Sequence, residues 1–155
     1  MKKRIKIFFY CCFLIGNLNL SAYCQDKKID SLVTLLNNSA IQVNGDYIGP
    51  SLMLTGQSAI QLSDIAKLAT GKLVSILDDS AKGVAAHYIL TMAYKLPIER
   101  ERMIYNNKDG IYTVSFAGLD FFINSKKVYA NKNDLEFNKY RWVDYLKGKG
   151  FAFKE

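Results

Sequence analysis

His87 is the residue with the widest range of possible chemistry, since it is the one histidine among 155 residues. An imidazole can act as a general acid, a general base or a metal ligand, so any mechanism of that kind would depend on this side chain. The residues around His87 are mostly apolar, and we therefore predict a hydrogen-bonded histidine in the protein core. Zinc sites are built from several histidine, cysteine or carboxylate ligands. The sequence predicts no metal and no cofactor.

The acidic residues provide one adjacent carboxylate pair, Asp78-Asp79. Such a pair could bind a hard cation or perform acid–base chemistry. Because both residues follow an amphipathic stretch, we expect them to cap the next helix and contact water. The sequence contains no Gly-x-Ser-x-Gly segment and no glycine-rich phosphate loop. We therefore predict no catalytic residues.

The first 24 residues have the pattern of a secretory signal peptide. Four basic residues precede the apolar run 7–15, which is too short to span a membrane, since a spanning helix needs about 20 apolar residues. Ala22 and Cys24 place small side chains at the −3 and −1 positions of a cleavage site before Gln25. We predict export to the periplasm or secretion, with no transmembrane segment.

Two alternatives apply to this leader. A lipoprotein would keep Cys24 as its lipidated first residue, but the bulky Tyr23 before it argues against a lipid anchor. The segment could instead form a buried N-terminal helix, although its charge asymmetry is typical of a leader.

Removal of the leader changes the bulk properties of the chain. All three cysteines, Cys11, Cys12 and Cys24, lie within it, so the mature protein would have no disulfide and no thiol chemistry. The net charge falls from +7 to +3, with 17 basic and 14 acidic residues remaining. Nucleic-acid binding needs a clustered basic face, and we expect none. The 131 residues of 25–155 have the size of one globular domain.

Hydrophobic spacing predicts a first helix that begins at the N-cap Asp26 and ends at Asn37-Asn38. Its apolar residues follow the 0, +3, +4, +7 pattern: Ile29, Leu32, Val33 and Leu36. A longer helix is predicted from Ser58 or Ser63 to Asp78-Asp79-Ser80, with Gly71 marking a kink or a close helix contact. Its stripe comprises Ile65, Leu68, Lys72 or Leu73, Ile76 and Leu77. The apolar segment Lys82–Tyr94 is predicted to be the central core helix.

The stretch Ile41–Gly56 contains two turn signals, Asn44-Gly45 and Gly49-Pro50. We therefore predict a loop there, with a short helical piece at Ser51–Leu54.

Residues 32–40 and 73–81 form an internal repeat at an offset of 41 residues, with five of nine positions identical. The second copy and the alanine-rich segment after it, which opens with Val84-Ala85-Ala86, resemble a HEAT-type helical repeat over about residues 31–94. The resemblance implies a packed helix pair. Ala85 stands where that family usually has a basic residue, and the first copy runs into Asn44-Gly45. Two unrelated amphipathic helices that end in Asx turns would give the same pattern.

After residue 97 the pattern becomes strand-like. Turn residues at Asn107–Gly110 and Asn124–Lys126 separate β-rich segments, and Ala117-Gly118 indicates a bulge or bend. The sequence predicts an antiparallel meander of three or four strands: Met103–Asn106, Ile111–Phe116, Leu119–Ile123 and Lys127–Ala130.

A closing helix is predicted from the capping-box pattern of Asn133–Glu136 to Gly148. The expected architecture is α+β in one domain, with a helical part at 26–96 and the meander plus closing helix at 97–155.

The closing helix also supplies the candidate binding residues. At 100° per residue, one side forms a core-facing stripe: Leu135, Trp142, Val143, Tyr145 and Leu146. Phe137, Tyr140 and Asp144 fall on the other side, with Arg141 beside them. Exposed tyrosine and arginine are typical of binding hot spots. Alternatively, Phe137 and Tyr140 pack beneath the carboxyl-terminal aromatics Phe151 and Phe153.

These features favour a non-catalytic exported protein that binds a protein partner, for example an inhibitor, a toxin antagonist or an accessory subunit. The alternative is a small carboxylate-dependent envelope enzyme such as a glycan hydrolase, which would need two acids flanking a cleft. A carbohydrate-binding envelope module is a further form of the binding hypothesis.

Overall fold

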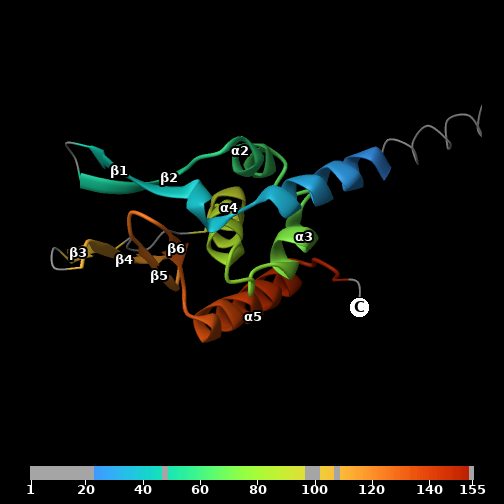
Figure 1. The fold of residues 1–155 in the computed structure, drawn as a ribbon. Helices are drawn as coiled ribbons and strands as arrows, with labels where there is room; N and C mark the ends of the chain where they lie inside the picture. Colours follow the sequence, from blue (N-terminus) through green and yellow to red (C-terminus); the bar gives the residue numbers. More distant parts are fainter. Residues whose placement is uncertain (1–22, 47–48, 97–101, 107–108, 154–155) are drawn as a thin grey trace, which may run out of the picture.

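The computed structural model describes residues 23–46, 49–96, 102–106 and 109–153 of the chain. The architecture is α+β, as predicted, with helices first, a β-hairpin, a four-stranded antiparallel sheet and a C-terminal helix (Figure 1). Residues 1–22 of the predicted leader and the predicted boundary at residue 97 lie outside the described residues.

The described chain opens with a helix over residues 23–35, followed by the 3-10 helix η1, Asn38–Ala40. The predicted apolar stripe is confirmed, because all four of its members are buried: Ile29, Leu32, Val33 and Leu36. Lys82 Nζ donates hydrogen bonds of 3.2 Å to the carbonyl oxygens of Val33 and Thr34. A lysine at this end of a helix satisfies carbonyls that have no partner within the helix.

Residues 41–54 form a β-hairpin, so the predicted loop and the helical piece at Ser51–Leu54 were wrong. Strand β1, Ile41–Asp46, pairs antiparallel with β2, Gly49–Leu54. Asn44 and Gly45 lie inside β1, with Ser51 and Pro50 as their register partners. The apolar residues Ile41 and Val43 alternate with polar ones, which is the period of a strand.

The predicted long helix is divided into α2, Gln57–Asp64, and α3, Thr70–Ser75. The break precedes Gly71, which was the expected kink. Contacts of Thr70 account for part of this break in the helix. Its Oγ1 lies within 3.1 Å of the carbonyl oxygens of Ala66 and Lys67 and 2.8 Å from the hydroxyl of Tyr94. Leu68, predicted to lie on the core stripe, is 65% exposed because it falls in this break.

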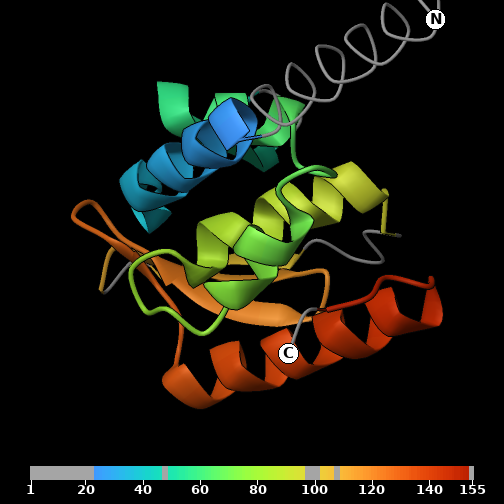
Figure 2. The same ribbon diagram turned by 90° about the vertical axis from the view of Figure 1, so that its right-hand side faces the viewer.

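Helix α4, Gly83–Tyr94, is the central core helix, as predicted. It lies at the centre of the fold, with the first helix and α2 on one side and the sheet and α5 on the other (Figure 2), and most of its side chains are buried. A side chain cannot replace the hydrogen of Gly83, because a Cβ there would overlap the carbonyl oxygen of Leu77. The backbone at Leu77, just after α3, is therefore in close contact with the first residue of α4.

The two copies of the internal repeat contact each other through Asn38, which is buried. Its backbone N–H donates to Ala81 O at 2.7 Å, its Nδ2 donates to Ser80 O, and its Oδ1 accepts from Ala85 N. The first copy leads into the β1–β2 hairpin and the second into α4. The HEAT resemblance stays a prediction.

The predicted meander is confirmed as a four-stranded antiparallel sheet in the order β3-β4-β5-β6. Its strands are Arg102–Asn106, Ile111–Phe116, Leu119–Ile123 and Val128–Tyr129. Ala117 and Gly118 have φ values of 46° and 81° and connect the register partners Phe116 and Leu119. They form a two-residue hairpin turn, which requires positive φ at both positions, and not the predicted bulge or bend.

Helix α5, Lys132–Gly148, closes the fold beneath α3, α4 and β5 (Figure 1). It begins at Lys132, one residue before the predicted capping box. That capping box was wrong, because the N-cap is Asn131 and no side chain caps the helix; Asn131 Nδ2 donates instead to Asp134 Oδ2 at 3.1 Å. The predicted core stripe is confirmed at Leu135, Trp142 and Leu146, which are buried, while Val143 and Tyr145 are half-buried.

Candidate functional site

A cleft of about 550 Å³ runs between α5 and the β4–β5 turn. Two residues that the sequence singled out for binding, Arg141 and Asp144, line it, and they lie one turn apart on α5. The remaining lining residues come from the end of α4, the β4–β5 turn and the inner side of α5: Leu96, Ala117, Gly118, Asn138, Trp142 and Tyr145. The structure thus brings half of the candidate binding set into one concave surface.

Arg141 fixes the position of α5 relative to the β4–β5 turn. Its Nη1 donates a 2.6 Å hydrogen bond to Gly118 O, and its Nη2 lies 3.5 Å from Ala117 O. A Cβ at Gly118 would displace the guanidinium, and its φ of 81° is one that other residues rarely adopt, so this turn position favours glycine. Ala117 adopts a left-handed conformation that costs a residue with a Cβ about 1 kcal/mol or more. The cleft wall therefore combines a strained residue with a tight polar contact.

Beneath the cleft, His87 is buried as predicted and bonds on both ring nitrogens. Trp142 Nε1 donates to His87 Nδ1 at 2.9 Å, and Nε2 lies 2.9 Å from the carbonyl oxygen of Phe116. An indole nitrogen can act as a donor alone, so Nδ1 carries no proton and Nε2 donates. Burial lowers the pKa of His87 to about 4, opposed by the bond to Phe116 and aided by Arg141. A neutral, fully bonded imidazole supports the cleft and offers no free nitrogen for catalysis.

Asn138 is a cleft residue that the sequence reasoning missed. It is buried, and its Nδ2 has no hydrogen-bond partner among the described residues. A buried amide without a partner is uncommon and destabilises the fold by about 1–3 kcal/mol. The sequence signal was present, because Asn138 lies three residues after Leu135 and four before Trp142, on the buried side of α5.

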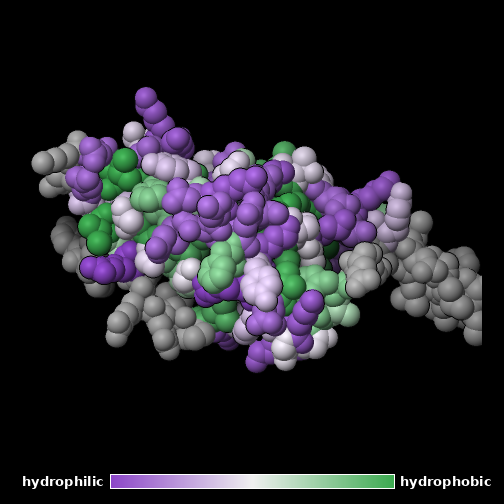
Figure 3. Space-filling view, turned by 90° about the horizontal axis from the view of Figure 1, so that it is seen from below, coloured by the Kyte–Doolittle hydropathy of each residue, from purple (hydrophilic) through white to green (hydrophobic). Residues whose placement is uncertain are grey.

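Phe137 and Tyr140 lie outside the cleft, on the solvent side of α5, and are 64% and 69% exposed. The carboxyl-terminal aromatics do not cover them. Phe151 lies beside α3, with its Cζ 4.0 Å from a Cβ built on Gly71, and its ring packs against Phe153. The face of the molecule that carries α5 is mainly hydrophilic, with small apolar areas among polar side chains (Figure 3). The two aromatics are therefore large apolar groups on a polar surface.

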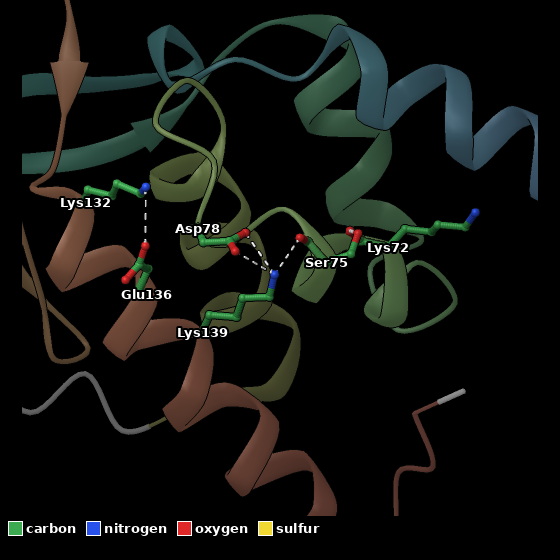
Figure 4. Close-up of polar contacts among 6 residues, drawn as sticks. All are labelled: Lys72, Ser75, Asp78, Lys132, Glu136 and Lys139. Atoms are coloured by element: carbon green, nitrogen blue, oxygen red, sulfur yellow. Dashed lines mark hydrogen bonds and ion pairs between the residues drawn. The ribbon is translucent and has the colours of Figure 1, made fainter. Parts of the chain in front are cut away.

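The adjacent carboxylates are engaged in local structure. Both oxygens of Asp78 accept hydrogen bonds of 2.9 Å from Lys139 Nζ, which also donates to Ser75 O (Figure 4). The bond from Lys139 holds the pKa of Asp78 below its ordinary value of 3.8. Asp79 Oδ1 accepts from the backbone N–H of Ala81 in an Asx turn before α4. The predicted capping of α4 by these carboxylates was wrong, because its N-cap is Lys82 and no side chain caps it. Asp78 therefore links α5 to the connection between α3 and α4, and Asp79 stabilises that connection.

Within the described ranges, no cluster of three or more histidine, cysteine, aspartate or glutamate side chains is arranged to hold a metal ion. None of the helices in the same ranges is long and apolar enough to cross a bilayer. Comparison with known proteins found no matching family model, no matching curated protein and no matching solved structure.

Proposed function

We propose that the protein is an exported, non-catalytic interaction module that binds a protein partner through the outer side of α5. The observation that carries this proposal is the exposure of Phe137 and Tyr140 on a hydrophilic face, with Arg141 next to them. Interfaces are commonly organised in this way, with a few aromatic anchors surrounded by a polar rim.

The chemistry of the cleft supports binding over hydrolysis. A glycan hydrolase of the usual kind needs two carboxyl groups about 5–10 Å apart on either side of the scissile bond. Of the described residues that line the cleft, Asp144 is the sole carboxylate. Asp78 is occupied by Lys139, and His87 is buried and bonded at both nitrogens. Export is supported by the basic and apolar pattern of the leader.

Site-specific photocrosslinking tests this proposal in the cells that produce the protein. Photoreactive benzoylphenylalanine in place of Tyr140 should give a discrete crosslinked species, which mass spectrometry then identifies. The matched control places the same group at Leu68, which is similarly exposed at 65% but lies between α2 and α3. Equal crosslinking at both positions, or none at position 140, would contradict an interface on α5.

A further inference from the structure

A second groove, of about 510 Å³, lies between the β1–β2 hairpin and the four-stranded sheet, away from the α5 site. The hairpins β1–β2 and β3–β4 project to the same side of α4, at the left of Figure 1. One wall of the groove comes from β1, with Ile41, Gln42 and Val43, and no residue of β2 lines it. The outer edge of β1 therefore borders this space.

The register of the hairpin shows which backbone groups of β1 face away from β2. Thr55 N donates to Ala40 O at 2.7 Å, so Ala40 and Thr55 form a hydrogen-bonded pair, and such pairs alternate along an antiparallel ladder. Val43 and Gly45 then fall in non-hydrogen-bonded pairs, opposite Leu52 and Pro50. Pro50, which has no N–H, fits such a position. The register therefore points the N–H and C=O groups of Val43 and Gly45 outward, and no hydrogen bond from the described turns, loops and caps reaches them.

The opposite wall carries an aromatic pair beyond the end of the packed core. Tyr105 and Tyr112 are register partners, with ring centroids 4.6 Å apart. They share the inner face of the sheet with the buried Val114, because alternate residues of a strand point to the same side. Tyr105 is nevertheless 50% exposed. This part of the inner face is open and offers a surface for an apolar or aromatic side chain.

The same wall ends in a basic turn. Asn124 Oδ1 accepts hydrogen bonds of 2.9 Å from the backbone N–H groups of both Lys126 and Lys127, which holds the turn in one shape. Both lysines are exposed and line the groove. The described residues of the groove include no carboxylate, so its charge is positive.

We propose that this groove binds an extended segment of a protein partner as an added strand on β1. The free groups of Val43 and Gly45 supply the backbone hydrogen bonds, and alternate side chains of the segment pack on Tyr105 and Tyr112. A carboxylate on the segment pairs with Lys126 or Lys127. Strand addition of this kind takes its affinity from the backbone and its selectivity from pockets for alternate side chains. An open strand edge in a folded protein otherwise invites unwanted pairing.

The test uses random dodecapeptides displayed on phage and selected against the mature protein. We expect the selected peptides to combine alternating apolar residues with an acidic residue. In the complex, amide hydrogen exchange at Val43 and Gly45 should slow relative to the free protein, because these N–H groups become donors. Val43→Pro removes one of them without removing a hydrogen bond to β2, and it should weaken peptide binding by about tenfold or more, a loss of about 1.4 kcal/mol.

Two controls are needed. The first separates the contribution of the Val43 N–H from that of its side chain, and the second separates the contribution of Lys126 and Lys127 from that of the net charge. Val43→Thr retains the N–H and the branched shape, so it should bind close to wild type. Lys126→Glu with Lys127→Glu should weaken binding, while Lys67→Glu, an exposed lysine between α2 and α3, should not. If Val43→Pro fails to fold, the exchange measurement on the wild-type complex and the lysine variants decide the question.

Several outcomes would overturn the proposal: no peptide selected above background, binding unaffected by Val43→Pro in a folded variant, or protection from exchange confined to other strands. A concentration-dependent dimer that Val43→Pro converts to monomer would assign the edge to a second copy of this chain. None of these outcomes bears on the α5 proposal, because the groove shares no lining residue with the α5 site.

Discussion

Trp142 on α5 donates a 2.9 Å hydrogen bond to Nδ1 of the buried His87 on α4. This bond fixes the tautomer of the imidazole, since the indole can only donate. The other ring nitrogen then donates to the carbonyl of Phe116, just before the β4–β5 turn. One side chain thus connects α4, α5 and the sheet through two directed bonds.

The stability of the fold should depend on pH through His87. In the unfolded chain its pKa is near 6.5, whereas burial lowers the pKa in the folded protein to about 4. Between these values the unfolded state binds more protons, so the free energy of unfolding should fall as the pH falls from 6.5 to 4. The pKa difference corresponds to about 3 kcal/mol, and no further loss from His87 is expected below pH 4. Urea unfolding at a series of pH values measures this slope.

The control for the pH effect is His87→Gln, which has no titrating ring. A folded variant should lose the slope between pH 6.5 and 4. The Lys139 contact acts in a lower window, because the lowered pKa of Asp78 makes its contribution disappear as the pH falls below about 3.8. An unchanged slope in the variant would mean that other groups cause it.

Truncation of either partner in the His87 and Trp142 pair should destabilise the protein. His87→Ala should lower the free energy of unfolding by about 1–3 kcal/mol, because the indole N–H loses its acceptor in a buried site. Trp142→Phe should also destabilise it, because Nδ1 then lacks its donor. The double variant should cost less than the two single losses added together, as for residues in one network. Additive losses in denaturant unfolding would show that the bond contributes little.

Substitutions at the two residues of the β4–β5 turn should change the stability of the protein in opposite directions. Ala117→Gly should stabilise the protein by about 0.5–1 kcal/mol, since glycine adopts a positive φ without strain. Gly118→Ala should destabilise it by more than that, because a side chain at a φ of 81° is strained and its Cβ would also displace the guanidinium of Arg141. Thermal midpoints of the two variants, measured together, test the assigned turn geometry. A Gly118→Ala variant as stable as wild type would contradict the positive φ assigned to this position.

Tyr140→Ala should leave the thermal midpoint within a few degrees of wild type, because exposed side chains contribute little to stability. If α5 is the partner interface, the same change should weaken capture of the crosslinked partner by about tenfold. Phe137→Ala should behave in the same way, and Leu68→Ala should affect neither property. A large fall in the midpoint with unchanged capture would place the interface elsewhere.

Export gives a further prediction. When the full chain is expressed, the protein should appear in the envelope fraction or the medium with an N-terminus at or near Gln25. N-terminal sequencing or intact mass measurement checks this. An intact Met1 on protein from the cytoplasm would contradict it.

Local periodicity predicted much of the fold. The apolar stripes of the first helix and α5, the apolar character of α4 and the turn residues that separate β3 to β6 are local patterns, and the elements that they predict were found. The β1–β2 hairpin was missed because Asn44-Gly45 and Gly49-Pro50 were both read as turn signals of a loop, whereas the first pair lies within β1 and the second within β2. The division between α2 and α3 depends on contacts of Thr70 that include Tyr94, a residue distant in sequence.

The candidate site was predictable in part for the same reason. A helical projection separated Phe137 and Tyr140 from the core stripe correctly, because exposure on a surface helix follows from its angle. The contact of Arg141 with Gly118 joins residues 23 positions apart, and no periodicity reveals such a pairing. Asn138 was visible on the buried side of α5, but its lack of a partner is a property of the packed structure.

Trp142 is the one tryptophan of the chain, and it occupies the junction of α5, α4 and the cleft. The tryptophan fluorescence of the protein, excited beyond the absorption band of tyrosine, therefore comes from a single buried reporter. Protonation of the adjacent imidazole, displacement of α5 by a bound partner and release of the indole on unfolding each alter its surroundings in a different way. An unlabelled sample, excited in the near ultraviolet, would thus report optically on the state of this junction during a titration.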